Sequence, residues 1–367
     1  MEKVILIEPV LAHYRKDVFE KLNNSKEFNF KIIAGRSYQG INSLKGHEQP
    51  LLHHISFNFL GHNFYYLQGI LKYLFKEKPD RIICTGIDFH LLHTLIIFFI
   101  HKFILRKKFY WWSHATIGHQ GKFGFLMRKI VYKSSSGIFS YNHKGRDNLI
   151  QMSVAEKNIE VVNNSLNKED YGYLNYNLHE AKSSNVFNIL YSGRITKAKK
   201  IDLLIKALTI LKEKNSFDFK CTIIGDGDLD GNILLSKSLN ISNSIDFVGA
   251  KYGKEAHPYF LNADLFVYPS GIGLSILHSF SFGIPVITTD NMDVHGPEIE
   301  LLKKDYNGNL FIHESAKDLA EKIIIWRAKI INSKEVYTKN CIQRIKDYAY
   351  LPEIMSHKVL NFLKQDC

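Results

Sequence analysis

A glycine and two cationic side chains follow a strand-like segment in the second half of the chain. Phe187 to Ser192 is predicted to be a buried strand, Gly193 and Arg194 come directly after it, and Lys199 follows shortly behind. A glycine lets the backbone come close to a phosphate, an arginine can grip two phosphate oxygens at once, and a lysine acts as a point charge. The same residues would also suit a turn with solvated surface cations. Two interpretations of this turn therefore remain open. Its cations either bind a diphosphate or only face solvent.

A second candidate phosphate site lies further along the same half. The predicted strand Leu265 to Tyr268 is followed by the turn PSGIGL (269–274), and a helix is expected to begin near Gly273. The free N–H groups at the start of a helix bind phosphate readily. Another predicted strand ends in a turn that contains Gly225 and Gly227. That turn is weak evidence alone, because Asp-Gly turns are common.

In the first half, polar side chains follow two predicted strands. His114 ends the strand-like run Phe109 to Ser113, and His13, Tyr14 and Arg15 come after the first strand. Ligands of open parallel sheets bind beyond the carboxyl ends of the strands. His114 is therefore a candidate for the site, although a lone histidine is more often structural. The other three are weaker candidates for contact with an acceptor or a phosphate.

Apolar strands alternate with helices in both halves, which predicts an α/β protein with two parallel sheets. In the first half, strands are predicted at 3–7, 30–34, 81–85 and 109–113, with helices at 15–22, 64–75 and 91–105. In the second half, strands are predicted at 187–192, 219–224, 245–248, 265–268 and 285–288, with a helix at 201–212. We expect a first domain over 1–165, a linker over 166–186, a second domain over 187–350, and a last helix over 351–367 that returns to the first domain.

Composition narrows the class of protein. A chain of 367 residues suits two domains, and 48 Lys and Arg against 36 Asp and Glu give a net charge of +12. Such a surplus attracts nucleotides, nucleic acids or anionic lipids, but no nucleic-acid-binding signature is present. The scattered cysteines, Cys84, Cys221, Cys341 and Cys367, predict neither a zinc site nor a disulfide framework. No apolar run reaches the roughly 20 residues that a membrane-spanning helix needs.

The order and spacing of the second-half motifs resemble glycosyltransferase family 4 over about residues 187 to 312. The matching motifs are Gly193-Arg194, Lys199, Asp202, Gly225-Asp226-Gly227, Val248-Gly249-Ala250, Ala263-Asp264, Pro269-Ser270, Gly273-Leu274 and Gly283-Ile284-Pro285-Val286. The resemblance implies the GT-B architecture, in which two Rossmann-like domains face a central cleft. It also implies a retaining reaction that needs no metal or cofactor. Arg194 and Lys199 would hold the donor diphosphate, helped by the amides of Gly273 and Leu274, and His114 would contact the donor sugar.

The sequence departs from the family pattern at two positions. Family members usually carry two glutamates in this turn and helix, one facing the donor sugar and one the ribose; Ser270 and His278 stand here instead. A serine can contact a sugar hydroxyl, and a histidine can hydrogen-bond a ribose. Glu298 is a candidate for the missing carboxylate, although a glutamate there would also suit the first turn of a helix.

The segment 91–112 combines apolar and aromatic side chains with four cations. It could lie on an anionic membrane as an amphipathic helix, or it could be a core helix that ends in solvated lysines. We expect a cytoplasmic enzyme, at the inner face of the cell membrane, that transfers a hexose from a nucleotide sugar. The expected acceptor is a lipid-linked glycan of bacterial surface polysaccharide or lipopolysaccharide synthesis. The alternatives are a nucleotide-sugar epimerase of the same fold and a pseudoenzyme that only binds the nucleotide sugar.

Overall fold

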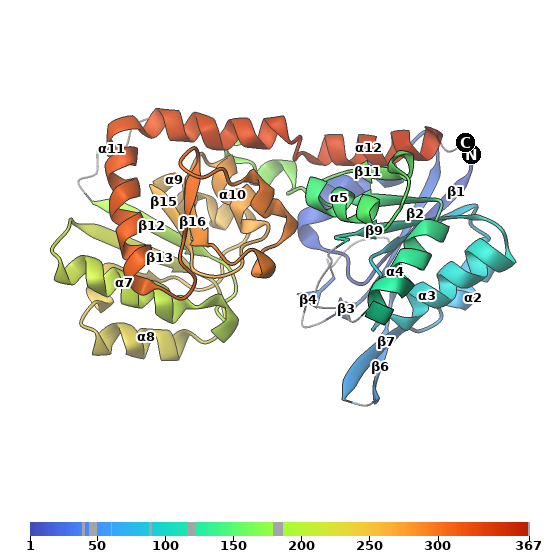
Figure 1. Cartoon of the computed structure of the whole chain (residues 1–367), viewed down its shortest axis with the longest axis horizontal. Coiled ribbons are helices and arrows are strands. Elements are labelled where there is room, and N and C mark those ends of the chain that lie inside the picture. The colour runs from blue at the N-terminus through green and yellow to red at the C-terminus, as the bar shows by residue number, and fades with distance from the viewer. Residues whose placement is uncertain are drawn as a thin grey trace. The chain divides into compact units, whose positions relative to one another are not determined.

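The computed structural model describes residues 1–38, 41–43, 50–59, 61–87, 90–115, 122–178 and 186–365. The chain divides into two compact units (Figure 1). Unit 1 comprises Met1–Asn167 together with Leu351–Cys367, and unit 2 comprises Lys168–Tyr350. Each unit is built around its own parallel sheet, so the prediction of an α/β protein with two parallel sheets is confirmed.

A seven-stranded parallel sheet in the order β11-β10-β9-β8-β1-β2-β5 forms the centre of unit 1. The strands are β1 (Lys3–Glu8), β2 (Asn29–Gly35), β5 (Leu51–Leu52), β8 (Arg81–Thr85), β9 (Lys108–Ser113), β10 (Gly137–Ser140) and β11 (Ile159–Val161). The chain moves from β1 towards one edge of the sheet and then returns to place β8 on the other side of β1. The strand order therefore reverses between β1 and β8, and this is the switch point of unit 1.

Helices cover both faces of this sheet, which explains its continuous apolar strands. They are α1 (Lys16–Asn23), α2 (Ile70–Glu77), α3 (Leu92–Phe99), the π-helix η2 (Ile100–Ile104), α4 (Lys122–Ser134), α5 (His143–Gln151) and α12 (Pro352–Gln365), with the 3-10 turns η1 (His13–Arg15) and η3 (Glu156–Asn158). Alternate residues of β1 enter two different cores. Ile5 packs with side chains of α2 and α3, whereas Leu6 packs with Phe19 of α1 and Val359 of α12.

The helix predicted over 64–75 is partly wrong. Residues 64–67 belong to an antiparallel hairpin of β6 (His54–Phe59) and β7 (His62–Leu67), and α2 begins only at Ile70. The aromatic residues of β7 favour a strand because they pair across the hairpin. Gly69, at φ +80°, then separates the strand from the helix. A second small hairpin joins β3 (Ser37–Tyr38) and β4 (Ile41–Asn42).

Unit 2 has a six-stranded parallel sheet in the order β14-β13-β12-β15-β16-β17. Its strands are β12 (Phe187–Ser192), β13 (Phe219–Ile224), β14 (Ile245–Phe247), β15 (Leu265–Tyr268), β16 (Val286–Thr289) and β17 (Gly308–Phe311). The order reverses between β12 and β15, which is the arrangement of a Rossmann-like fold.

The helices of unit 2 vary widely in length. They are α6 (Gly172–Asn175), α7 (Ile201–Glu213), α8 (Leu229–Ser238), α9 (His257–Asn262), α10 (Ser275–Ser281) and α11 (Ala316–Asp347), with the 3-10 turns η4 (Lys168–Asp170), η5 (Lys197–Lys199), η6 (Ser242–Ser244), η7 (Gly253–Glu255), η8 (Met292–Val294) and η9 (Pro297–Leu301). The long α11 is kinked at Ser333, whose φ of −153° is not helical. Among the helices that the structure describes, none is long and apolar enough to cross a membrane.

Candidate functional site

The switch point of unit 2 brings together two loops that the sequence pointed to. Residues 193 and 194 follow β12, and residues 269–274 follow β15, its neighbour in the sheet. The connections from these two strands lead to opposite sides, so a crevice opens beyond their carboxyl ends, where ligands of this fold bind. We call these two loops, together with Lys199, the switch-point site.

Lys199 joins the two loops of the switch-point site. Its Nζ donates a hydrogen bond of 3.0 Å to the carbonyl oxygen of Gly271 and lies 5.1 Å from the centroid of the Tyr268 ring. The side chain of Lys199 is half-buried, whereas that of Arg194 is exposed. One cation is thus held between the two loops, and the second, Arg194, is exposed beside them.

Gly225 and Gly227 hold the turn that carries Arg194. Their φ angles are +155° and +129°, and a Cβ on either residue would lie 2.0 Å from a carbonyl oxygen, that of Gly193 or of Ile195. Ile195 donates from its N–H to the carbonyl of Asp226 at 2.7 Å. Only glycine permits two backbones to pack this closely. These two glycines therefore act by positioning the turn that carries Arg194.

The loop after β15 rests on a second segment, residues 294–298. A Cβ on Gly271 would lie 1.9 Å from the carbonyl oxygen of Val294. The N–H of Ile272 donates to Nδ1 of His295 at 3.1 Å, so Nε2 carries the ring proton and donates to the carbonyl of Thr289 at 2.9 Å. Burial lowers the pKa of His295, which favours this neutral tautomer. His295 thus fixes the loop of residues 269–274 that follows β15.

Glu298 lies behind the same loop. Its side chain is buried, with 2% exposed, and its Oε2 is 3.6 Å from the position that a Cβ on Gly273 would occupy. The residue belongs to the 3-10 turn η9. A carboxylate is therefore present beside the residues that precede α10. Whether it faces a donor, as the sequence suggested, stays a prediction.

Ser270 and His278 both carry buried polar atoms without a hydrogen-bond partner among the described residues, namely Oγ of Ser270 and Nε2 of His278. The His278 ring lies against aromatic side chains, with centroid distances of 4.1 Å to Phe260 and 5.5 Å to Phe282. Burial lowers the pKa of His278 to about 3, so the ring is uncharged at neutral pH. Buried polar atoms are rarely left unpaired in proteins, which makes both atoms candidates for contact with a ligand.

The switch point of unit 1 holds a buried polar network. Glu8, at the end of β1, accepts a hydrogen bond of 3.0 Å from Arg15 and one of 2.6 Å from the Thr85 hydroxyl. Arg15 also donates to the hydroxyl of Tyr141. Burial raises the pKa of Glu8, and the Arg15 charge opposes this shift. Breaking such a buried pair leaves a charge uncompensated and is strongly destabilising.

His114 lies on this network. Its ring stacks on Tyr141 with a centroid distance of 4.3 Å and an interplanar angle of 25°. Desolvation by the surrounding atoms and the charge of Arg15 lower the pKa of His114, although its side chain is exposed. A neutral, accessible imidazole therefore stands at the carboxyl edge of the unit 1 sheet.

Of the candidates in η1, Arg15 is committed to Glu8 and Tyr141, so it would act on an acceptor only through these partners. His13 has an exposed side chain and Tyr14 a half-buried one, and acceptor contact by both stays a prediction. Sequence reasoning missed Glu8 and His295. A charged residue at the end of the apolar run KVILIE was a usable signal for Glu8. His295 was recognisable only as part of the polar turn that contains Glu298, and its contact with Ile272 was not.

Residues 179–343 match the sequence model of the family described as glycosyl transferases group 1. Unit 2 is a glycosyl transferases group 1 domain. The match lies within unit 2, and this is the family that the order of the motifs indicated, whose members take the sugar from a nucleotide-activated donor. A comparison with curated proteins gave no match.

Several solved structures resemble this chain over its whole length. A glycosyltransferase from Rickettsia africae is 18% identical, with a TM-score of 0.73, covering 100% of this chain and 98% of that chain. The apo form of the lipopolysaccharide outer core galactosyltransferase WaaB is 17% identical, with a TM-score of 0.69 and 100% of both chains covered. HepE from Anabaena in complex with UDP is 15% identical, with a TM-score of 0.70 and 100% of both chains covered. At these identities the similarity establishes the GT-B type of fold alone.

Proposed function

We propose that the chain is a retaining hexosyltransferase that works without a metal and uses a nucleoside-diphosphate sugar. The observation that carries this proposal is Lys199, whose ammonium group bridges the two loops at the unit 2 switch point, next to the exposed Arg194. These two cations are placed where they can bind a diphosphate, and catalysis is what the hydrolysis test below separates from binding alone. UDP is the first nucleotide to test, because HepE, which shares the fold, is described in complex with UDP and with UDP-glucose.

The chemical role of the switch-point site is to stabilise the departing nucleoside diphosphate. Negative charge builds on the diphosphate as its bond to the sugar breaks, and preorganised cations and amides lower the energy of that state. Arg194 and Lys199 supply the charge, and the amides of Gly273 and Leu274 supply further donors. His114 of unit 1 is proposed to hydrogen-bond the donor sugar, which its neutral, accessible ring permits.

The two missing glutamates are replaced in this proposal by three residues. The unpaired Oγ of Ser270 contacts a sugar hydroxyl, and the unpaired Nε2 of His278 contacts the ribose. Glu298 supplies a carboxylate from behind Gly273. The donor sugar is thus held by a different set of side chains from the usual pair, and sugar specificity is the property most affected.

The proposed acceptor is a glycan on a lipid carrier, in the synthesis of a bacterial surface polysaccharide of the O-antigen or capsule type. The net charge of +12 favours contact with lipid phosphates, and WaaB, of similar fold, is a lipopolysaccharide galactosyltransferase. We place the enzyme in the cytoplasm at the inner face of the cell membrane. Of the predicted contact segment 91–112, only the exposed part before β9 is proposed as the contact, because residues 109–112 are buried in the core. No role with nucleic acid is proposed.

Two other functions compete with this one. A putative UDP-N-acetylglucosamine 2-epimerase from Listeria monocytogenes also has this fold, with a TM-score of 0.68 at 14% identity, covering 99% of this chain and 95% of that chain. The loss of both glutamates would also suit a pseudoenzyme that binds a nucleotide sugar. Slow hydrolysis of the donor without acceptor separates a transferase from a pseudoenzyme, and an epimerised donor identifies an epimerase.

The decisive experiment measures calorimetric binding of UDP, GDP, ADP and CMP without added metal, together with donor hydrolysis. Arg194→Ala and Lys199→Ala should each weaken diphosphate binding or turnover by about 1.5–3 kcal/mol, the value of a charge-assisted contact. Glu298→Gln should lower hydrolysis and leave UDP binding unchanged. Lys197→Ala is the matched control, since Lys197 is an exposed cation in the same turn. Equal losses in the control, or wild-type behaviour in both cation variants, would overturn the assignment.

A further inference from the structure

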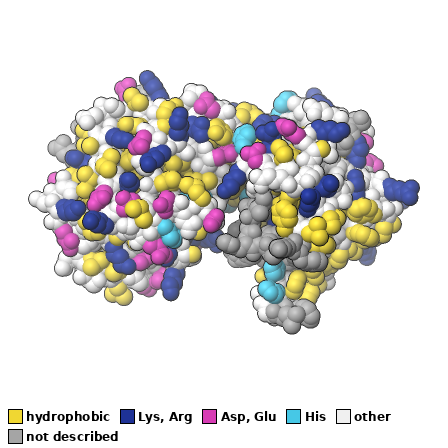
Figure 2. Space-filling view, viewed as in Figure 1, with side chains coloured by type: hydrophobic (Ala, Val, Ile, Leu, Met, Phe, Trp, Pro, Cys, Tyr) yellow, Lys and Arg dark blue, Asp and Glu magenta, His cyan; other side chains and the backbone are white. Residues whose placement is uncertain are grey.

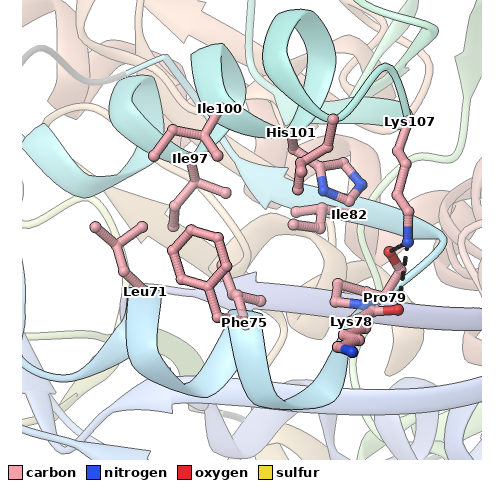
Figure 3. A pocket seen from close by; sticks show the side chains of 11 residues that line it. Leu71, Phe75, Lys78, Pro79, Ile82, Ile97, Ile100, His101 and Lys107 are labelled. Atoms are coloured by element: carbon pink, nitrogen blue, oxygen red, sulfur yellow. Dashed lines mark hydrogen bonds between the residues drawn. The ribbon is translucent and has the colours of Figure 1, made fainter.

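Unit 1 contains an apolar pocket that the sugar-transfer reaction does not use. It has a volume of about 270 Å³ and lies between α2 and the α3–η2 segment. Figure 3 shows Leu71 and Phe75 on one helix facing Ile97 and Ile100 on the other, with Ile82 of β8 between them. An apolar cavity of about 150 Å³ already binds benzene, so this pocket has room for a longer hydrocarbon.

One end of the pocket is polar and carries two lysines (Figure 3). Lys78 and Lys107 line it together with His101, and Lys107 donates to the carbonyl of Pro79 at 2.6 Å and lies 3.6 Å from Asp80. His101 is only 3% exposed, and its Nε2 has no hydrogen-bond partner among the described residues. An amphiphile with an apolar chain and an anionic head matches both parts of this pocket.

Apolar side chains surround the pocket on the outer surface of the unit. Phe75, which lines it, is 56% exposed, and Phe99 and Ile104 of the α3–η2 segment are 59% and 64% exposed. Figure 2 shows hydrophobic side chains gathered over the region of α2, α3 and α4, with lysines and arginines beside them. The cations in the same two stretches of chain, 71–78 and 97–108, are Lys72, Lys76, Lys78, Lys102, Arg106, Lys107 and Lys108. Such a patch on a monomer marks an interaction site, and its charge complements an anionic membrane surface.

We propose that this pocket takes one hydrocarbon chain of an anionic membrane lipid, while Phe99 and Ile104 insert at the bilayer interface. Apolar area and basic charge together set the strength of such interfacial binding. Ile82 is the second residue of β8 and Lys107 immediately precedes β9, so the pocket lies at the amino end of these strands. Glu8 and His114 lie at the opposite, carboxyl edge. The bound chain is therefore an anchor that is separate from the reacting acceptor.

This inference rests on the proposed membrane contact and not on the sugar-transfer activity. It is tested by sedimentation of the full chain with phosphatidylglycerol vesicles and with phosphatidylcholine vesicles. The wild type should bind the former and lose binding as salt rises. Phe99→Glu and Ile104→Glu should each weaken binding about tenfold, which is the effect expected from losing one buried apolar side chain. Leu234→Glu, on α8 of unit 2, is the matched control, because Leu234 is 65% exposed but far from the pocket in sequence and in another unit.

The pocket itself is tested by filling it. Ile97→Trp, or Leu71→Trp if the first variant does not fold, should abolish the one-to-one complex with dioleoyl-phosphatidylglycerol that native mass spectrometry should show for the wild type. Donor hydrolysis in solution should stay unchanged in all these variants, so a failure here is distinguishable from a failure of the proposed function. Wild-type lipid binding by the filled pocket would overturn the proposal. The proposal would also be overturned if the wild type did not bind vesicles and formed a dimer that Phe99→Glu dissociates. The surface would then be an interface with a second copy of the chain.

Discussion

At the scale of single residues, the proposed donor site differs from the family pattern, because neutral polar groups stand where the family has charged ones. Two carboxylates are replaced by a serine and a histidine whose buried polar atoms lack partners among the described residues. Unpaired groups of this kind cost free energy in the unliganded protein. A ligand that supplied these hydrogen bonds would recover the cost, so under the proposed function Ser270 and His278 should favour a sugar nucleotide that presents hydroxyl groups at these two points.

The same histidine makes stability depend on pH. Burial lowers the pKa of His278 to about 3, against 6.5 when it is exposed. A histidine with a lowered pKa in the folded state stabilises the fold fully above pH 6.5, and this contribution is lost as the pH falls towards 3, because only the unfolded chain takes up the proton. Between pH 8 and pH 5 the expected loss is about 2 kcal/mol, at about 1.36 kcal/mol per pH unit below 6.5.

His278→Phe isolates this effect, since phenylalanine can occupy the aromatic surroundings that Phe260 and Phe282 provide. Urea denaturation of both proteins at pH 8 and pH 5 should show a smaller decline for the variant by about 2 kcal/mol. His93 and His101 also have pKa values lowered by burial, but they remain in both proteins and cancel in the comparison. Parallel declines would show that the His278 ring is not buried in solution.

At the scale of elements, two turns of unit 2 are locked together through backbone contacts. Gly227→Ala would place a Cβ 2.0 Å from the carbonyl oxygen of Ile195, at a φ of +129°. We expect a loss of stability on the order of 1–3 kcal/mol, together with weaker diphosphate binding because the turn that carries Arg194 must shift. Thermal unfolding and calorimetry measure the two effects. Gly69→Ala is the control, since Gly69 has a φ of +80° but open space around its Cβ position. Gly69→Ala should lower stability and leave diphosphate binding unchanged. Unchanged diphosphate binding in Gly227→Ala would contradict the positioning role of Gly227.

The sequence predicted the two parallel sheets well, but it did not predict the hairpin at residues 64–67 or the contacts between distant loops. The alternation of apolar strands and helices was sufficient to predict both parallel sheets, because each strand is buried on two faces. Phe64 to Leu67 misled the helix prediction, since aromatic residues spaced for a helix also suit a hairpin. The Lys199 contact with Gly271 spans 72 positions, and the His295 contact with Ile272 spans 23. Such contacts are set by strand order, which local patterns do not encode.

At the scale of the whole molecule, the chain consists of two units with separate cores. Multidomain proteins often unfold in more than one step. A ligand that binds one unit should stabilise that unit alone, by an amount set by its concentration relative to Kd. Because Gly193, Lys199 and Gly273 all belong to unit 2, the proposed nucleotide binding should distinguish the stability of unit 2 from that of unit 1.

Hydrogen exchange followed by mass spectrometry checks this expectation. With the tightest-binding diphosphate at 100 times its Kd, exchange in β12, β15 and β16 should slow by about a hundredfold, since only the nucleotide-free protein can open. Exchange in β1 and β9 should stay unchanged, because their hydrogen bonds lie in the sheet of unit 1. The protein without nucleotide is the reference for both. Equal slowing of exchange in the two sheets would mean that the two units open as one cooperative body. The chain connections at Asn167 and Leu351 would then couple them, and their stabilities would not be independent.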